Sequence, residues 1–291
     1  RNCLLQKIFV NIFIKSMKNK IGVMQGRLLP KYKKKYQAHP VGYWQEEFVI
    51  AQKIGLDCVE FILDFDGAEE NPLLTKEGIS QINKVVDETG VSVQTVCVDY
   101  LMEAPLHSEN IVEVECSKQI MTRLFNNSSK LGITDLVIPC VDKSSLNSKG
   151  AIDRFVSQIS PMVEIAEDKR INLSLETDMP PGPFLELLDY FDSKYVTVNY
   201  DIGNSAALGY DPVEELSAYG NRITDIHIKD RELYGDSVIL GNGNANFDKF
   251  FKSLSKFNYQ GLFIMQAYRD ENGVDIFKKQ LNWIDAYLRQ L

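Results

Sequence analysis

The chain has 291 residues, of which 44% are hydrophobic and 25% are charged, and its formal net charge is −8 at pH 7. This is the composition of an ordinary globular protein that is long enough to bury a large core without disulfide or metal staples. The acidic balance argues against a general nucleic-acid-binding protein, which presents a basic face.

The start of the chain is a short apolar stretch that we separate from the rest. Residues 1–16 combine a basic start with a hydrophobic run, but lysines and asparagine interrupt the run and no small-residue cleavage site follows. The run is also shorter than the roughly 20 apolar residues that span a bilayer, so we expect no membrane association. Met17 opens a segment that leads into a first strand. We therefore expect residues 1–19 to be an extension outside the fold and residues 20–291 to form one domain.

From Lys20 onward, short β-branched or apolar runs alternate with longer segments of helical periodicity. The runs predict eight strands, at residues 21–28, 58–64, 92–99, 135–141, 172–177, 196–204, 223–230 and 261–268. The other segments predict eight helices, at residues 43–54, 75–88, 108–131, 151–169, 184–191, 212–219, 247–257 and 274–288. Gly55, Gly90 and Gly132 each follow a helical run directly, which is typical of a helix end.

Eight strands that alternate with eight helices favour an α/β fold with a parallel sheet and right-handed crossovers. We expect the sheet to close into a single-domain (β/α)8 TIM barrel. A doubly wound open sheet is the alternative, but no G-x-G-x-x-G turn opens a first helix. The glycine-rich stretch 241–247 predicts a loop before a late helix. The basic stretch 31–36 lies in the first βα loop, where it is either a solvated surface or a lid that attracts phosphate.

The cysteines give no sign of a zinc site or of a disulfide framework. They are Cys3, Cys58, Cys97, Cys116 and Cys140. Their number is odd, and three of them fall inside predicted strands. We therefore expect buried, reduced thiols in a cytoplasmic protein.

Four consecutive predicted strands carry a polar residue where a buried strand ordinarily has valine or isoleucine. These residues, on the fifth to the eighth strand, are Glu176, Asp201, His227 and Gln266. Active sites of such barrels lie at the C-terminal ends of the strands, where adjacent strands bring such side chains together. Burying them unpaired costs on the order of several kcal/mol, so we expect them to bind something. Two carboxylates, an imidazole and an amide oxygen suit one divalent metal ion: Mn²⁺, Mg²⁺, Co²⁺ or Zn²⁺.

Five segments carry a likeness to a known family. They are MQGRLLP (24–30), DIGNSAALGYDP (201–212), HIKDR (227–231), LGNGNANF (240–247) and FIMQ (263–266). With them, the chain resembles the xylose isomerase-like barrel superfamily of sugar phosphate isomerases and epimerases, from about residue 20 to its end. It looks closest to branches that contain L-ribulose-5-phosphate 3-epimerase. The resemblance implies that Glu176, Asp201 and His227 hold a metal.

The chain departs from the family at the fourth ligand, where the family's glutamate falls on Gln266. A glutamine can still ligate through its amide oxygen, but it cannot take or give a proton. In the family, two glutamates are thought to work as acid and base on opposite faces of the substrate, so one partner is missing here.

The resemblance implies an isomerase or epimerase that acts on a small sugar or sugar phosphate. It would remove a proton next to the substrate carbonyl through a metal-stabilised enediolate, with Glu176 as the base. Without a base at Gln266, we expect single-base chemistry such as aldose–ketose isomerisation, unless Glu60 or Asp99 supplies the second group. Glu60 matches a glutamate that family members carry at this place.

Further polar residues near the strand ends are candidates for binding substrate. They are Arg27, Asp99, Asn204, Lys229 and Arg231. Lys229 and Arg231 follow His227 closely and suit a phosphate or sugar oxygens, although simple exposure is the alternative for Arg231. Arg27 lies at the end of the first strand and suits the same role.

Two other functions remain open at this point. One is a non-catalytic, metal-dependent sugar binder that lost its base at Gln266. The other is a barrel-type metal-dependent endonuclease, which needs many histidines, whereas the chain has only His39, His107 and His227. We expect a small-molecule partner rather than nucleic acid or membrane. The oligomeric state is open, and a homodimer is compatible with the sequence.

Overall fold

The computed structural model describes residues 19–271 and 273–291. Residues 1–18 of the expected extension lie outside these ranges. Asn19 is buried, and its side-chain amide donates to the backbone oxygens of Tyr259 (3.0 Å) and Gly261 (3.1 Å). No helix within the described ranges is long and apolar enough to cross a membrane.

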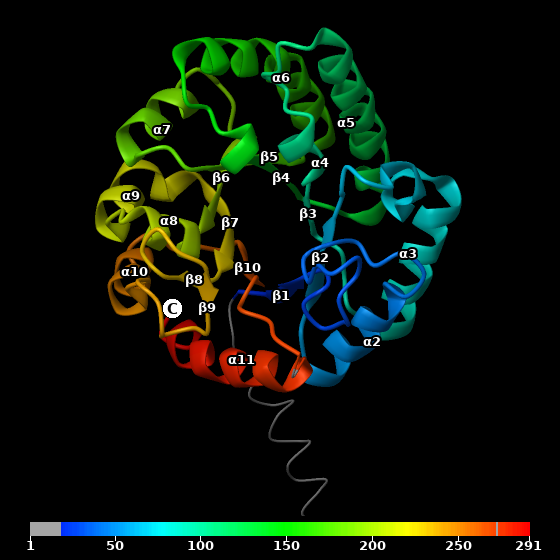
Figure 1. Cartoon of the computed structure of the whole chain (residues 1–291), viewed down its shortest axis with the longest axis vertical. Helices are drawn as coiled ribbons and strands as arrows, with labels where there is room; N and C mark the ends of the chain where they lie inside the picture. Colours follow the sequence, from blue (N-terminus) through cyan, green and yellow to red (C-terminus); the bar gives the residue numbers. More distant parts are fainter. Residues whose placement is uncertain (1–18, 272) are drawn as a thin grey trace, which may run out of the picture.

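Eight parallel strands close into a barrel in the spatial order β1-β10-β7-β6-β5-β4-β3-β2. The strands are β1 (Ile21–Met24), β2 (Cys58–Ile62), β3 (Thr95–Cys97), β4 (Asp135–Cys140), β5 (Asn172–Thr177), β6 (Val196–Asp201), β7 (Ile223–Ile228) and β10 (Leu262–Met265). The first strand pairs with the last, so the barrel has no free edge. The predicted (β/α)8 fold is confirmed, and Figure 1 shows the helices as an outer ring around the strands.

The eight predicted helices are all present. They are α2 (Gln45–Ile54), α3 (Lys76–Thr89), α5 (Ile111–Leu131), α6 (Lys149–Lys169), α7 (Pro181–Leu188), α9 (Pro212–Tyr219), α10 (Phe247–Leu254) and α11 (Val274–Leu288). Two of them, α9 and α11, have the predicted ends, and the others are shifted at one or both ends. Polar N-caps set several starts, because Thr75, Asn110 and Ser148 accept hydrogen bonds from backbone N–H groups of the first turn.

Apart from short 3-10 turns, four short elements were not predicted from the sequence. They are α4 (Tyr100–Glu103), α8 (Ile202–Leu208) and the hairpin strands β8 (Asp230–Arg231) and β9 (Ser237–Val238). Helix α8 shows that the predicted strand 196–204 is too long. Strand β6 ends at Asp201, whose Oδ1 accepts the backbone N–H of Asn204 (2.8 Å) and so caps α8. Aspartate is favoured at the N-cap of a helix, so the chain starts α8 here instead of continuing the strand.

Apolar side chains fill the space around the barrel, and inside it they pack beside buried polar ones. Inside lie Met24, Cys58, Ile62, Cys97, Val137, Leu262 and Ile264. A larger cluster packs the strands against the surrounding helices. Cys58, Cys97 and Cys140 are buried free thiols, as predicted, whereas Cys116 on α5 is a free thiol that is exposed. Cys3 lies outside the described residues. The barrel is thus a packed core, and chemistry is confined to its ends.

Candidate active site

Three of the four predicted metal ligands meet at the C-terminal end of the barrel. Glu176 on β5, Asp201 on β6 and His227 on β7 each place a ligand atom within 4.8 Å of the others. His227 Nδ1 lies 3.9 Å from Glu176 Oε2 and 4.0 Å from Asp201 Oδ2. These separations are too long for hydrogen bonds, and Nδ1 is buried without a hydrogen-bond partner among the described residues. The spacing suits a cation that contacts all three side chains.

The fourth predicted ligand, Gln266, directly follows β10. Its backbone N–H donates to Ile228 O (3.1 Å), which continues the pairing one residue beyond the strand. Its side-chain Nε2 donates to Gln37 Oε1 (3.0 Å) and contacts Met24 Sδ (3.2 Å). The remaining side-chain oxygen, Oε1, is buried and has no partner in the described part of the chain. Gln266 therefore keeps one ligand atom available for a cation.

Glu60, a predicted catalytic residue, contacts the far side of the His227 ring. Glu60 Oε1 lies 3.0 Å from His227 Nε2, and neither side chain has any exposed surface. Glu60 Oε2 accepts a hydrogen bond from Thr95 Oγ1 (2.8 Å). A carboxylate beside Nε2 favours a proton on that nitrogen, so Nδ1 is the nitrogen that a metal ion would bind, in place of a second proton.

A second buried carboxylate near the ring, Asp225, was missed in the sequence. It lies two residues before His227 on β7, and strand alternation therefore puts both on the inward face. Asp225 Oδ2 lies 2.8 Å from Thr95 Oγ1. Burial and then the charge of Glu60 raise the pKa of Asp225 well above its ordinary value, which favours the protonated form. The two-residue period of a strand could have identified Asp225 in the sequence, because it places this residue on the same face as His227.

The cluster contains more buried negative charge than positive charge. Burial lowers the pKa of His227, but the carboxylates of Glu60, Glu176 and Asp225 outweigh it and raise that pKa to about 10. Burial raises the pKa of Glu176 to about 7, with the charge of His227 opposing and that of Asp201 adding to the shift. The raised pKa values of His227 and Glu176 point to the same conclusion. The site holds carboxylates that need a positive charge, and a divalent cation would supply it.

Three of the predicted substrate-binding residues form a network around the carboxylates. Asn204, in the first turn of α8, donates through Nδ2 to Glu176 Oε1 (2.7 Å). Its Oδ1 accepts from Lys229 Nζ (3.2 Å) and Arg231 Nη1 (2.9 Å). Lys229 Nζ also lies 3.4 Å from Asp201 Oδ2. The network orients both carboxylates and places two cations at the rim of the site.

The remaining predicted substrate-binding residues, Arg27 and Asp99, lie on the other side of the mouth and are joined by Gln37. Arg27 Nη2 donates to Gln37 Oε1 (2.9 Å), and Gln37 Nε2 donates to Asp99 Oδ2 (3.4 Å). Burial lowers the pKa of Arg27 to about 10, so its guanidinium stays charged at neutral pH. Gln37 was not singled out in the sequence, and no periodicity or motif marks it.

A buried aspartate holds the predicted glycine-rich loop in place. Asp230 Oδ2 accepts the backbone N–H groups of Gly241 (2.9 Å) and Gly243 (2.9 Å), and Oδ1 accepts that of Ala245 (3.0 Å). A Cβ added at Gly243 would lie 2.2 Å from Asp230 Oδ1, so the close approach requires glycine. The loop is thereby anchored to β8, the strand that also carries Arg231.

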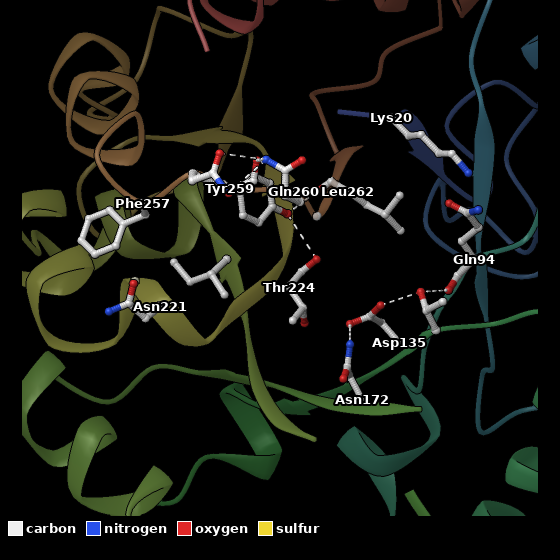
Figure 2. A pocket seen from close by; sticks show the side chains of 15 residues that line it. Lys20, Gln94, Asp135, Asn172, Asn221, Thr224, Phe257, Tyr259, Gln260 and Leu262 are labelled. Carbon is white, nitrogen blue, oxygen red and sulfur yellow. Dashed lines mark hydrogen bonds between the residues drawn. The ribbon is translucent and has the colours of Figure 1, made fainter. Parts of the chain in front are cut away.

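Cavities lie at both ends of the barrel. One of about 490 Å³ opens at the C-terminal ends of β2 and β3, and is lined by Lys35, Gln37, Asp64, Phe65, Asp66, Asp99, Met102 and Glu103. Another, of about 570 Å³, is shown in Figure 2 beside Asp135, Asn172 and Leu262, the first residues of three barrel strands. The first cavity lies at the end of the barrel where active sites of this fold occur. None of the four predicted metal ligands lines it, but its residue Gln37 accepts a hydrogen bond from Gln266.

Known proteins agree with this architecture. The family described as xylose isomerase-like TIM barrel matches residues 48–287. L-ribulose-5-phosphate 3-epimerase UlaE of Escherichia coli O1:K1 / APEC is 25% identical over 262 residues, which cover 86% of this chain and 92% of that protein. A solved D-tagatose 3-epimerase-like protein has a TM-score of 0.66 at 22% identity, covering 92% of this chain and 98% of that one. The IOLI protein, solved with a zinc atom, has a TM-score of 0.72 at 15% identity, covering 94% and 99%.

Proposed function

The chain belongs to the xylose isomerase-like TIM barrel family, and on that premise we propose that it is a metal-dependent isomerase or epimerase of a small sugar or sugar phosphate. The observation that carries the proposal is the convergence of Glu176, Asp201 and His227 around a buried ring nitrogen without a hydrogen-bond partner among the described residues. The substrate class is supported by the relative named L-ribulose-5-phosphate 3-epimerase.

One divalent ion, Mn²⁺, Mg²⁺, Co²⁺ or Zn²⁺, fits the donor set. The residues that would hold it are Glu176, Asp201, His227 and Gln266, which offer oxygen and imidazole ligands. The orphaned His227 Nδ1 and Gln266 Oε1 and the excess of buried negative charge all support this assignment. When bound, the ion would stabilise the negative charge that develops on the substrate carbonyl oxygen as a proton leaves the neighbouring carbon.

Glu176 is the proposed general base. Asn204 holds its Oε1, which leaves Oε2 on the side of the other ligands. A carboxylate can act as a general base, and this one is buried beside the place where the substrate carbonyl would bind the ion. Its task is to take the proton from the carbon next to the carbonyl. Arg27 and Lys229 remain available at the mouth to bind sugar or phosphate oxygens.

The rival functions find less support. His39 packs against Phe61 and Trp44, with ring centroids 5.5 and 6.2 Å away, so only His227 of the chain's histidines joins a potential metal cluster in the described ranges. This disfavours an endonuclease with several zinc ions. Turnover separates an enzyme from a sugar binder. A binder would gain thermal stability with sugar but would place no solvent deuterium on a sugar carbon.

We expect Glu60→Gln to weaken Mn²⁺ binding by about 10- to 100-fold, because an outer carboxylate orients the liganding imidazole and strengthens its basicity. The measurement is calorimetric titration of metal-free protein. Glu215→Gln is the matched control, since Glu215 is another buried glutamate, held by Tyr200 and Tyr219 outside the cluster. Unchanged metal affinity with lost turnover would instead make Glu60 a catalytic base.

We expect Gln266→Glu to tighten Mn²⁺ binding by about tenfold or more, because an anionic ligand replaces a neutral one. The same titration measures it. Gln94→Glu, at the opposite end of the barrel beside the larger cavity, adds the same charge far from the cluster and should change little. Equal affinities of the native protein and Gln266→Glu would remove Gln266 from the ligand set.

A further inference from the structure

Epimerisation needs a proton donor on the face of the carbon opposite the base, and Gln266 cannot serve. The structure separates the two candidates for that donor. Glu60 is fully buried, with one oxygen at the His227 ring and the other on Thr95. A carboxylate committed in this way cannot reach a substrate carbon. Glu60 therefore acts through His227, as a positioning residue.

Asp99 is placed differently. It is partly exposed and lines the cavity at the C-terminal ends of β2 and β3. Its Oδ1 accepts a hydrogen bond from Cys97 Sγ (3.0 Å) and its Oδ2 a long one from Gln37 Nε2 (3.4 Å). Within the described residues no lysine or arginine forms an ion pair with it. The two hydrogen bonds thus fix the orientation of the Asp99 carboxylate, which can still exchange a proton.

Gln37 ties Asp99 to the position of the missing base. The same side chain that donates to Asp99 accepts a hydrogen bond from Gln266 Nε2 (3.0 Å). Glu176 is held from the other side of the mouth by Asn204 on α8. Asp99 follows β3 and Glu176 lies on β5, so both carboxylates belong to the C-terminal end of the barrel and are held by different amide side chains.

Resting on the proposed function, we infer that Asp99 is the second proton-transferring residue and restores epimerisation to a chain that lacks the family's second glutamate. Glu176 takes the proton as the C–H bond breaks, and the electron pair stays on the substrate. Protonated Asp99 then gives its proton to the opposite face of the same carbon as the new C–H bond forms. Glu176 returns its proton to solvent and Asp99 recovers one, so the cycle is balanced without an oxidant or reductant.

The surroundings of Asp99 make its protonated form accessible. Burial raises the pKa of Asp99, while the hydrogen bonds from Cys97 and Gln37 lower it. The charge of Glu60 raises the pKa of Asp99, and that of His227 lowers it. Arg27 also interacts with Asp99, whose charge raises the pKa of the guanidinium. Lys35, Asp64, Asp66 and Glu103 line the same cavity.

The test uses metal-loaded full-length protein and a panel of ketopentoses and ketohexoses, free and phosphorylated, that carry deuterium at carbon 3. Two quantities are followed in ordinary water: loss of deuterium from recovered substrate and appearance of the 3-epimer. Asp99→Asn should lower epimer formation by about 100-fold or more and leave deuterium loss within about threefold, because Glu176 still abstracts the proton. Asp99→Glu, which keeps a carboxyl group, should recover part of the epimer formation.

Asp135→Asn is the control, since Asp135 is a buried aspartate at the opposite end of the barrel, and it should change neither quantity. Epimer formation by Asp99→Asn at the native rate would overturn the inference, as would equal losses of epimer and deuterium exchange. Deuterium loss without any epimer in the native protein would overturn it too, while leaving the role of Glu176 intact. If the metal-loaded protein showed neither deuterium loss nor epimer formation with any sugar, the proposed function itself would be wrong.

Discussion

Replacing His227 by alanine is expected to abolish tight metal binding, with at least a ~100-fold loss of affinity for Mn²⁺ or Zn²⁺. The imidazole is the only nitrogen ligand in the proposed set and lies between the two carboxylates that complete it. Its removal leaves Glu176 and Asp201 without the third ligand atom, His227 Nδ1, that lies near both carboxylates. Metal content after dialysis, measured by inductively coupled plasma mass spectrometry, gives the result directly.

His39→Ala is the matched control for this substitution. His39 is also a buried histidine, but it packs against Phe61 and Trp44 rather than in the cluster. Burial lowers its pKa to about 4, so both variants lose a large ring from the interior, but only one loses a ligand. If the barrel does not tolerate alanine at position 227, His227→Gln keeps most of the volume. Native metal content in folded His227→Ala or His227→Gln would refute the metal centre.

Glu176→Gln is expected to lower turnover by about 10²- to 10⁴-fold at saturating metal, because general-base catalysis contributes about that much. The amide keeps an oxygen for the metal and a similar shape, but it cannot accept the proton. Both deuterium exchange and product formation should fall together, in contrast to the Asp99 variant. The measurement is the rate of exchange at the sugar carbon, followed by NMR.

Glu215→Gln again provides the reference, because it neutralises a buried glutamate whose partners are Tyr200, Ser205 and Tyr219. It should exchange deuterium at the native rate. Metal content is determined in parallel, so that a loss of ligand is not mistaken for loss of the base. Exchange by metal-loaded Glu176→Gln within about tenfold of the native rate would mean that another group removes the proton.

The order of strands and helices could be predicted because the two periodicities alternate from residue 20 to the end of the chain. Element ends were less predictable, since side-chain caps decide them. Asp201 shows this. The apolar pattern continues past it as a strand, but its carboxylate captures the N–H of Asn204 and starts α8. The hairpin of β8 and β9 has too few residues for any periodic signal.

The convergence of Glu176, Asp201 and His227 could also be predicted, because neighbouring parallel strands end at one rim and these residues interrupt apolar runs. The contacts of the remaining polar residues could not be predicted from the sequence. Glu60 reads as a second base in the sequence, yet it contacts the His227 ring from strand β2 on the other side of the barrel. Such a contact across the barrel depends on side-chain direction, which linear spacing does not encode. The part played by Gln37 is hidden for the same reason.

The central claim is that this barrel uses a metal and Glu176 to remove a proton next to a sugar carbonyl. The most direct measurement is uptake of solvent deuterium at a sugar carbon, by NMR in D₂O, with metal-free protein and with the same protein reloaded with Mn²⁺. The account predicts uptake with at least one ketose or ketose phosphate, loss of uptake in the metal-free protein and recovery on reloading. Uptake that is unaffected by metal removal, or no uptake with any sugar by the reloaded protein, would contradict it.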